Sequence, residues 1–231
     1  MRTLVGFVTC NLVVGAAFNA ALAHGIGGKD AAFVAATKGA DVLPFMYLGA
    51  KHMVTGYDHL LFILGVIFFL YRIRDVALYV TLFSVGHSVT LLAGVLLKID
   101  VNAYLVDAII GLSVAYKAFD NLGGFKSVFG VQPNDKVAVA SFGLIHGFGL
   151  ATKLQALRLN ADGLVTNMVS FNIGVELGQL LALSIILAFM VWWRRTASFD
   201  RLAASANALI LMAGFILMEY QLAGYFIRGG A

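Results

Sequence analysis

Long apolar runs dominate this chain and constrain its fold more than any other feature. A hydrocarbon core about 30 Å thick is crossed by about 20 apolar residues in a helix. Six segments approach or exceed this length, and the breaks between them are rich in charged residues, glycine or asparagine. The predicted spans are 55–72, 76–97, 102–120, 136–157, 166–193 and 203–226.

The composition supports this interpretation. Only 12% of the 231 residues are charged, against about 25% in an ordinary soluble domain. A soluble fold could not cover its surface with so few charges, so the apolar excess must face lipid. The net charge of +4 is small and scattered, which argues against a nucleic-acid partner. The single cysteine, Cys10, excludes a disulfide framework and a thiolate metal cluster.

The N-terminus has the pattern of a secretory signal peptide. Arg2 precedes the apolar stretch 4–20, and Ala21 and Ala23 form a small-x-small cleavage pattern. We predict that residues 1–23 are a cleaved signal peptide, followed by a single transmembrane domain over 24–231. The alternative is an uncleaved first helix, which would give seven spans. The fold class is therefore an all-α, polytopic transmembrane helix bundle, with a short interfacial or re-entrant helix at 43–54 before the first mature span.

Basic residues predict the orientation of the bundle. With the mature N-terminus outside, eight basic residues lie in or beside the inner connections and four at the outer ends of the spans. The inner residues are Arg72, Arg74, Lys117, Lys126, Lys136, Arg194, Arg195 and Arg201. The outer residues are Lys98, Lys153, Arg158 and Arg228. This excess agrees with the positive-inside rule and with the signal peptide, and it predicts that the mature N-terminus lies on the outer side.

Polar residues inside the predicted spans are the candidate site. Each intramembrane charge costs about 2.5–3.5 kcal/mol or more at a helix centre, so several are retained only if they are paired, hydrated or functional. From the helical rise, Asp58 and His59 are expected about 5 Å from the outer end of their span, and Asp107 about 8 Å. His87, His146 and Glu176 are expected near 15 Å, around the midplane. Residues from several spans therefore share one layer that opens outward.

The residue types in this layer predict a transition-metal site. Imidazoles with nearby carboxylates suit zinc, nickel or cobalt better than calcium or magnesium. The candidate metal-binding residues are His52, Asp58, His59, His87, His146, Asp107 and Glu176. His52 and His59 are about 10 Å apart along an unbroken helix, so a break at Gly56 is needed to bring them together. Asn172, Glu176 and Gln179 are spaced so that they form a polar stripe on one helix face. Asn172, Gln179 and Ser88 are predicted to be supporting polar residues of the site.

Five ordered motifs give the chain a family resemblance. The segment HMVTGYDH over 52–59 resembles the His-x5-Asp-His signature of the HupE/UreJ family of hydrogenase and urease accessory membrane proteins. GHSVTL around His87, VDAIIGLSV from Val106, FGLIHGFGLA around His146 and FNIGVELGQL around Glu176 are also similar. Asp107 stands where the family more often has Glu, and 149–151 lack the second His and Glu of the hydrogenase-linked branch. The chain is thus most similar to the urease-type branch.

The resemblance implies a polytopic inner-membrane protein that admits nickel or cobalt. We therefore predict a permease for a divalent metal ion entering from the periplasm. One alternative is an intramembrane zinc-dependent hydrolase, in which Asp58 or Glu176 is the catalytic base for a metal-bound water. Another is a metal chaperone or sensor without transport. No protein partner is predicted beyond the metal ion and the lipid bilayer.

Overall fold

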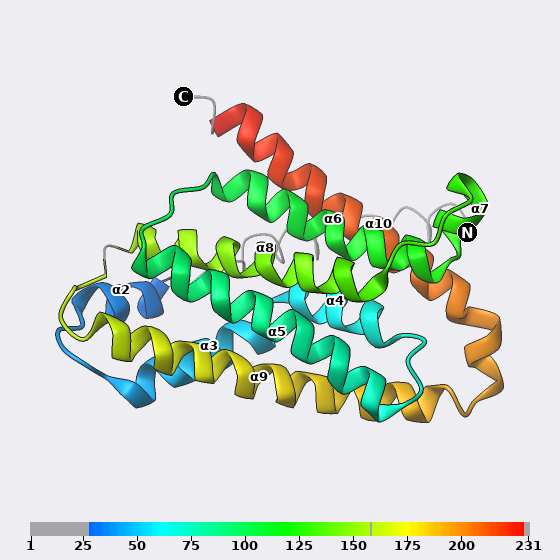
Figure 1. The fold of residues 1–231 in the computed structure, drawn as a ribbon, viewed down its shortest axis with the longest axis horizontal. Coiled ribbons are helices and arrows are strands. Elements are labelled where there is room, and N and C mark those ends of the chain that lie inside the picture. Colours follow the sequence, from blue (N-terminus) through cyan, green and yellow to red (C-terminus); the bar gives the residue numbers. More distant parts are fainter. Residues whose placement is uncertain (1–27, 158, 229–231) are drawn as a thin grey trace, which may run out of the picture.

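The computed structural model describes residues 28–157 and 159–228. Helices form all the regular secondary structure of these residues (Figure 1). The helices are α2 (Gly28–Ala36), α3 (Val42–Thr55), α4 (Tyr57–Ile67), α5 (Ile73–Leu96), α6 (Ala103–Asn121), α7 (Gly124–Phe129), α8 (Asp135–Ala156), α9 (Leu164–Trp193) and α10 (Ala197–Arg228). The predicted signal peptide, residues 1–23, lies outside the described residues.

Four helices are long and apolar enough to cross a membrane, namely α5, α8, α9 and α10. They correspond to the predicted spans 76–97, 136–157, 166–193 and 203–226. The all-helical membrane architecture is thereby confirmed. The other two predicted spans overlap α6, with 19 residues, and α4, with 11 residues. The count of six spans therefore stays a prediction.

Gly56, between α3 and α4, separates the segment predicted at 43–54 from the first predicted span, 55–72. Gly56 adopts an extended conformation (φ −76°, ψ 98°) and ends one helix while starting the next. Asp58 and His59 were expected near the outer end of a helix. Because α3 begins at Val42, they instead lie near the middle of the broken helix that α3 and α4 form. The ring of His59 lies 5.0 Å from that of His146, so placing Asp58 and His59 about 10 Å outward of His146 was wrong. The segment predicted at 43–54 is α3, and it packs along α9.

Side-chain hydrogen bonds to the backbone join the helix connections at each end of the bundle. At one end, the amide of Asn167 in α9 accepts from the Asp41 backbone and donates to the carbonyl of Gly39. At the other end, the Arg194 guanidinium donates to the carbonyls of Ile67, Phe68 and Leu70, which follow one another at the C-terminus of α4. A cation at a helix C-terminus satisfies carbonyls that have no intrahelical partner. These contacts fix the ends of α3, α4 and α9 relative to one another.

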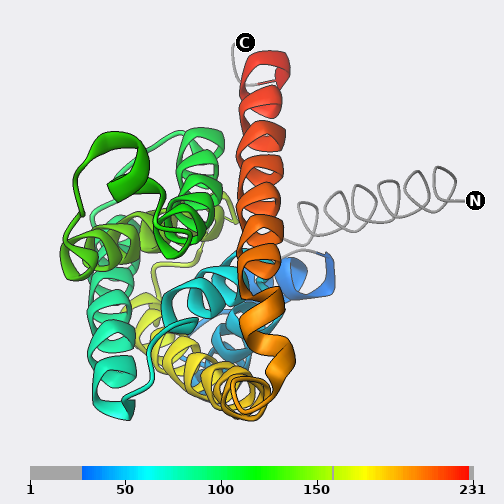
Figure 2. The same cartoon turned by 90° about the vertical axis from the view of Figure 1, so that its right-hand side faces the viewer.

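Successive long helices run in opposite directions between these two ends (Figure 1). Helix α5 packs against α8, α3 against α9 and α6 against α10. Figure 2 looks at the bundle from the end that carries α7, and shows α10 rising from the end of α9 past α4 to α6. The centre of the bundle, where α4 begins, is therefore surrounded by α3, α5, α6, α8 and α9.

Glycines allow the close approach of α3 and α9. A Cβ added at Gly174 would clash with the carbonyl of Met46, and one added at Gly49 would clash with that of Phe171. Both obstacles are backbone atoms, which cannot move aside as a flexible side chain can. Small residues in such interfaces let helix backbones pack at short range.

We therefore expect Gly174→Ala to lower the melting temperature of the purified protein in detergent, because inserting a methyl group into a packed interface costs about 1–3 kcal/mol. Gly65→Ala is the matched control, since its added Cβ would lie 3.5 Å from the nearest atom, the Cγ of Lys117. Equal melting temperatures for the two variants would contradict the packing described here.

Candidate metal centre

The break at Gly56 sets the position of three candidate ligands. His52 lies in the last turn of α3, while Asp58 and His59 lie in the first turn of α4. The break brings the His52 and His59 rings to a centroid distance of 5.3 Å. The expectation that a break at Gly56 joins these two histidines is confirmed.

Two further histidines reach His59 from other helices. The His87 ring, from α5, lies 5.8 Å from the His59 ring, and the His146 ring, from α8, lies 5.0 Å from it. All four imidazoles are buried, and the exposed fraction of His146 is 0%. Glycines in α8 permit this approach, because a Cβ at Gly147 would clash with the carbonyl of His87.

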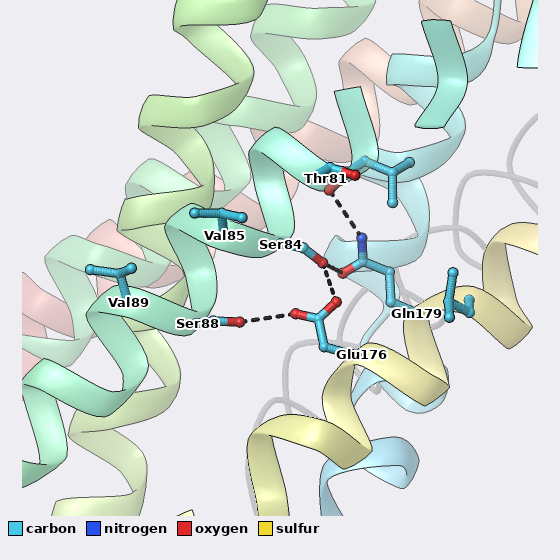
Figure 3. Close-up of a pocket in the computed structure, with 9 residues that line it drawn as sticks. Thr81, Ser84, Val85, Ser88, Val89, Glu176 and Gln179 are labelled. Carbon is cyan, nitrogen blue, oxygen red and sulfur yellow. Dashed lines mark hydrogen bonds between the residues drawn. The ribbon is translucent and has the colours of Figure 1, made fainter. Parts of the chain in front are cut away.

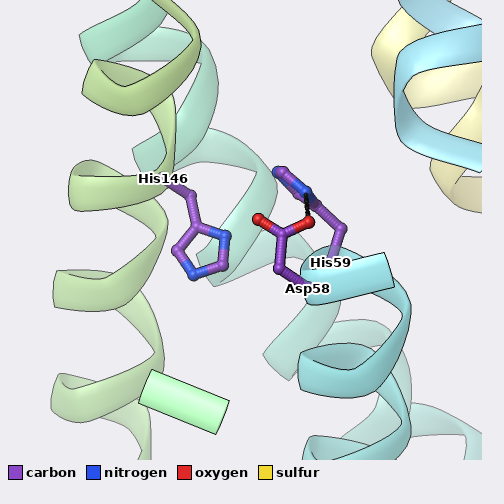
Figure 4. Close-up of side chains that lie close together, drawn as sticks. All are labelled: Asp58, His59 and His146. Carbon is purple, nitrogen blue, oxygen red and sulfur yellow. Dashed lines mark hydrogen bonds and ion pairs between the residues drawn. The ribbon is translucent and has the colours of Figure 1, made fainter. Parts of the chain in front are cut away.

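Asp58, His59 and His146 form the tightest group (Figure 4). Each offers one ligand atom, and these atoms lie within 4.8 Å of one another. Two nitrogen or oxygen donors about 2.1 Å from a common ion are at most about 4.2 Å apart. Small side-chain rotations would therefore bring the three atoms onto one metal ion.

Hydrogen bonds orient two of these rings. His59 Nδ1 lies 2.9 Å from Asp58 Oδ1, so this nitrogen carries the proton that is donated to the carboxylate. His146 Nε2 lies 3.0 Å from the hydroxyl of Ser113, which itself donates to the carbonyl of Ile110. Ser113 therefore accepts a hydrogen bond from the N–H of His146 Nε2. In each ring the other nitrogen, Nε2 of His59 and Nδ1 of His146, then has the lone pair that a metal ion requires.

Buried nitrogens without hydrogen bonds support the fit of a metal ion. Within the described residues, His59 Nε2 and both ring nitrogens of His87 are buried and have no hydrogen-bond partner. Leaving a buried polar group unsatisfied costs about 1–3 kcal/mol. A divalent ion would bind the lone pair of His59 Nε2 and that of one His87 ring nitrogen, and the mixed imidazole and carboxylate set suits zinc, nickel or cobalt.

Phenylalanine rings enclose the group. Phe62 and Phe83 lie 5.3 Å and 5.0 Å from the His146 ring, measured between centroids, and Phe83 stacks on His87 at 6.1 Å. An apolar shell excludes water and strengthens the attraction between an ion and its ligands.

Asp107 and Glu176 lie apart from this group. Asp107 forms an ion pair with Lys153 at 2.9 Å. Lys153 lies about two turns after His146 on α8. Glu176 accepts hydrogen bonds from Ser84 and Ser88 between α5 and α9. The structure thus brings the four histidines together with Asp58, and leaves these two carboxylates in separate polar contacts.

The supporting amides follow Glu176. Gln179 is buried and lies within hydrogen-bond distance of Ser84, while Asn172 is partly buried one turn before Glu176. The polar stripe of α9 therefore faces α5, and not the histidines.

Two features of α6 were missed from the sequence. Ser113 contacts His146, and one turn later the buried Lys117 pairs with Asp120 at 2.5 Å and with Asp135 at 3.2 Å. The four-residue spacing of Ser113 and Lys117 puts them on one helix face, and this is the signal that could have found them.

The fold and this centre define an integral membrane protein with a buried histidine and aspartate cluster at a helix break. The family model described as HupE / UreJ protein matches residues 28–229, which is most of the chain. The chain belongs to the HupE/UreJ family, whose members are membrane accessory and metal-transport proteins. Comparisons with curated proteins and with solved structures find no match.

Proposed function

We propose that this protein is an inner-membrane permease for a divalent transition-metal ion, nickel or cobalt, which enters from the periplasm. In this proposal, Asp58, His59 and His146 hold the ion. His52 and His87 bind it transiently as it enters and leaves this group. The observation that carries the proposal is the meeting of four buried imidazoles and one carboxylate at the break between α3 and α4.

The helix break suits transport because it places ligands from two half-helices beside one ion. Transporters bind ions at discontinuous helices near the bilayer midplane. Asp58 lies in the first turn of α4, directly after the break at Gly56 that ends α3. A small rotation at Gly56 would change the distance between His52 and His59 without unfolding either half-helix. Ligands that can separate in this way allow the exchangeable binding that a permease requires.

Asp107 and Glu176 are not part of the proposed ligand set, because Lys153 and two serine hydroxyls occupy their oxygens. The positive-inside count supports the proposed orientation, with the connections at 68–72, 122–134 and 194–196 on the cytoplasmic side.

Flux measurements test the proposal. Wild-type protein in liposomes that contain a metal-sensitive dye should admit nickel or cobalt faster than empty vesicles, and His146→Ala should lower the initial rate at least about tenfold. Correctly inserted wild-type protein with no flux above empty vesicles would overturn the proposal. In that case, zinc that does not exchange would favour the hydrolase, and exchangeable metal would favour a chaperone or sensor.

A further inference from the structure

A metal ion that leaves the four histidines and Asp58 for the cytoplasm needs polar groups along its way to the inner end of the bundle, where the connection 122–134 lies. On α4 and α8, the buried side chains between these ligands and the inner end are apolar. Helix α6 differs, because its inner half carries the buried polar residues Ser113 and Lys117. Helix α6 is therefore the element that can line an inward route.

The polar cavity between α5 and α9 does not open toward the inner end. It has a volume of about 330 Å³ and lies around Ser84, Glu176 and Gln179 (Figure 3). The residues Val85 and Leu180 at its rim are 57% and 55% exposed. Exposed apolar side chains on membrane-spanning helices face lipid, so this cavity opens sideways into the bilayer.

Ser113 and Lys117 extend from the histidines toward the inner surface. The Ser113 hydroxyl contacts His146, and Lys117 lies one turn further along the same face of α6. The stem of Lys117 passes α4 at Gly65, which follows Asp58 by two turns. A Cβ added at Gly65 would lie 3.5 Å from Lys117 Cγ. Lys117 is therefore inward of the metal ligands on α4 as well as on α8.

The Lys117 ammonium occupies the inner end of the interface between α6 and α8. It contacts Asp120 on α6 at 2.5 Å and Asp135, the first residue of α8, at 3.2 Å. The exposed side-chain fraction rises from 8% for Lys117 to 30% for Asp135, so this ion-pair cluster extends from the buried interior to the surface. Gln132, in the connection before α8, donates to the other oxygen of Asp120.

We propose that Lys117 is the inner gate of the permease. While its ammonium contacts Asp120 and Asp135, the route from the histidines to the cytoplasm is closed, and it opens when the ammonium swings aside. The inference rests on the proposed function, because it assigns the exit of the same metal ion. A positive charge repels a divalent cation strongly in a low-dielectric interior. Lysine suits this role, since its charge lies on a flexible four-carbon stem that can rotate while the helix stays in place.

Weakening the hold on the ammonium should speed transport without changing metal binding. Asp135→Asn removes one of the two carboxylates and leaves Asp120 to pair with Lys117. In liposomes that contain a metal-sensitive dye, we expect the maximal rate of nickel entry to rise about two- to fivefold, the population shift expected for the loss of one partly exposed ion pair. The metal content of the purified protein should stay at the wild-type value.

Asp75→Asn is the matched control for Asp135→Asn. Asp75 lies at the same end of the bundle, in the first turn of α5, whereas the ion pairs of Lys117 are to Asp120 and Asp135. The control removes the same charge from the inner end, and its rate of nickel entry should equal that of the wild type.

Strengthening the hold should have the opposite effect. Lys117→Arg keeps the positive charge, and the planar guanidinium can donate to both carboxylates at once, so we expect slower nickel entry with unchanged metal content. Melting temperatures in detergent separate gating from loss of the fold. If Lys117→Arg does not fold, the comparison of Asp135→Asn with Asp75→Asn decides the proposal.

Three outcomes contradict the gate. Wild-type protein with no nickel entry above empty vesicles would overturn the permease and the gate together. Wild-type entry with equal rates for Asp135→Asn and Asp75→Asn would overturn the gate alone. Slower entry through Asp135→Asn at a wild-type melting temperature would also overturn it, and would assign Asp135 to metal binding on the way out.

Discussion

Replacing His146 with alanine should remove most of the metal that the purified protein binds. His146 supplies one of the three closest ligand atoms and is fully buried, so no water can readily take its place. Loss of a residue that only orients a metal ligand costs about 10–100-fold in affinity. Loss of a ligand itself should exceed the upper end of that range. Elemental analysis after dialysis against a metal buffer would measure the effect, and His59→Ala should give the same result.

Graded variants distinguish a metal centre from a structural cluster. Ser113→Ala removes only the acceptor for His146 Nε2, and we expect metal affinity to fall about tenfold. Asp107→Asn and Glu176→Gln are the controls, because both carboxylates lie outside the group and should leave the metal content unchanged. Equal metal content in the wild type, His146→Ala and His59→Ala would exclude the centre.

The sequence predicted the helices well because hydrophobic length is a local property. The runs that became α5, α8, α9 and α10 are long and almost free of charge, so they were recognisable without tertiary information. The family resemblance was confirmed for the same reason, since motifs such as the one over 52–59 are contiguous in the chain.

The depth of Asp58 and His59 could not be predicted in the same way. The estimate assumed a span beginning at 55, whereas α3 begins at Val42 and fills the outer part of the broken helix. The segment before Gly56 contains Lys51 and His52, which lower its apparent hydrophobicity and hide its continuity with α4. Only the packing of α3 on α9 shows where the first ligands lie.

The contacts of the polar side chains on α6 and α9 could not be predicted from the sequence either. Glu176 was expected to assist the histidines because its estimated depth matches that of His87 and His146 and because its polar stripe should face the bundle interior. Depth and periodicity give the level and the face of a helix, and not its neighbour. Lys117 was assigned to the inner connections as a topology signal. In the structure its side chain is buried and pairs with Asp120 on α6 and with Asp135 on α8, and the second pairing depends on the position of α8.

Replacing Lys117 with methionine should strongly destabilise the protein. The Lys117 ammonium contacts Asp120 at 2.5 Å and Asp135 at 3.2 Å, with side-chain exposed fractions of only 8% for Lys117 and 6% for Asp120. Removing one member of a buried ion pair costs about 3–5 kcal/mol, and here both aspartates would lose their cation while Gln132 would still donate to Asp120. Methionine keeps the length of the side chain, so the loss should come from charge and not from packing. Thermal unfolding in detergent would measure it.

The triple variant Lys117→Met, Asp120→Asn, Asp135→Asn separates charge from shape. It removes all three charges and keeps the approximate volumes, and neutral replacement of a buried ion-pair cluster is often tolerated. We expect it to recover most of the stability that Lys117→Met loses. Metal binding should persist in the triple variant, because Lys117 lies one turn beyond Ser113 and outside the ligand group. If the triple variant were as unstable as Lys117→Met, the cluster would contribute through its hydrogen-bond geometry and not through charge compensation.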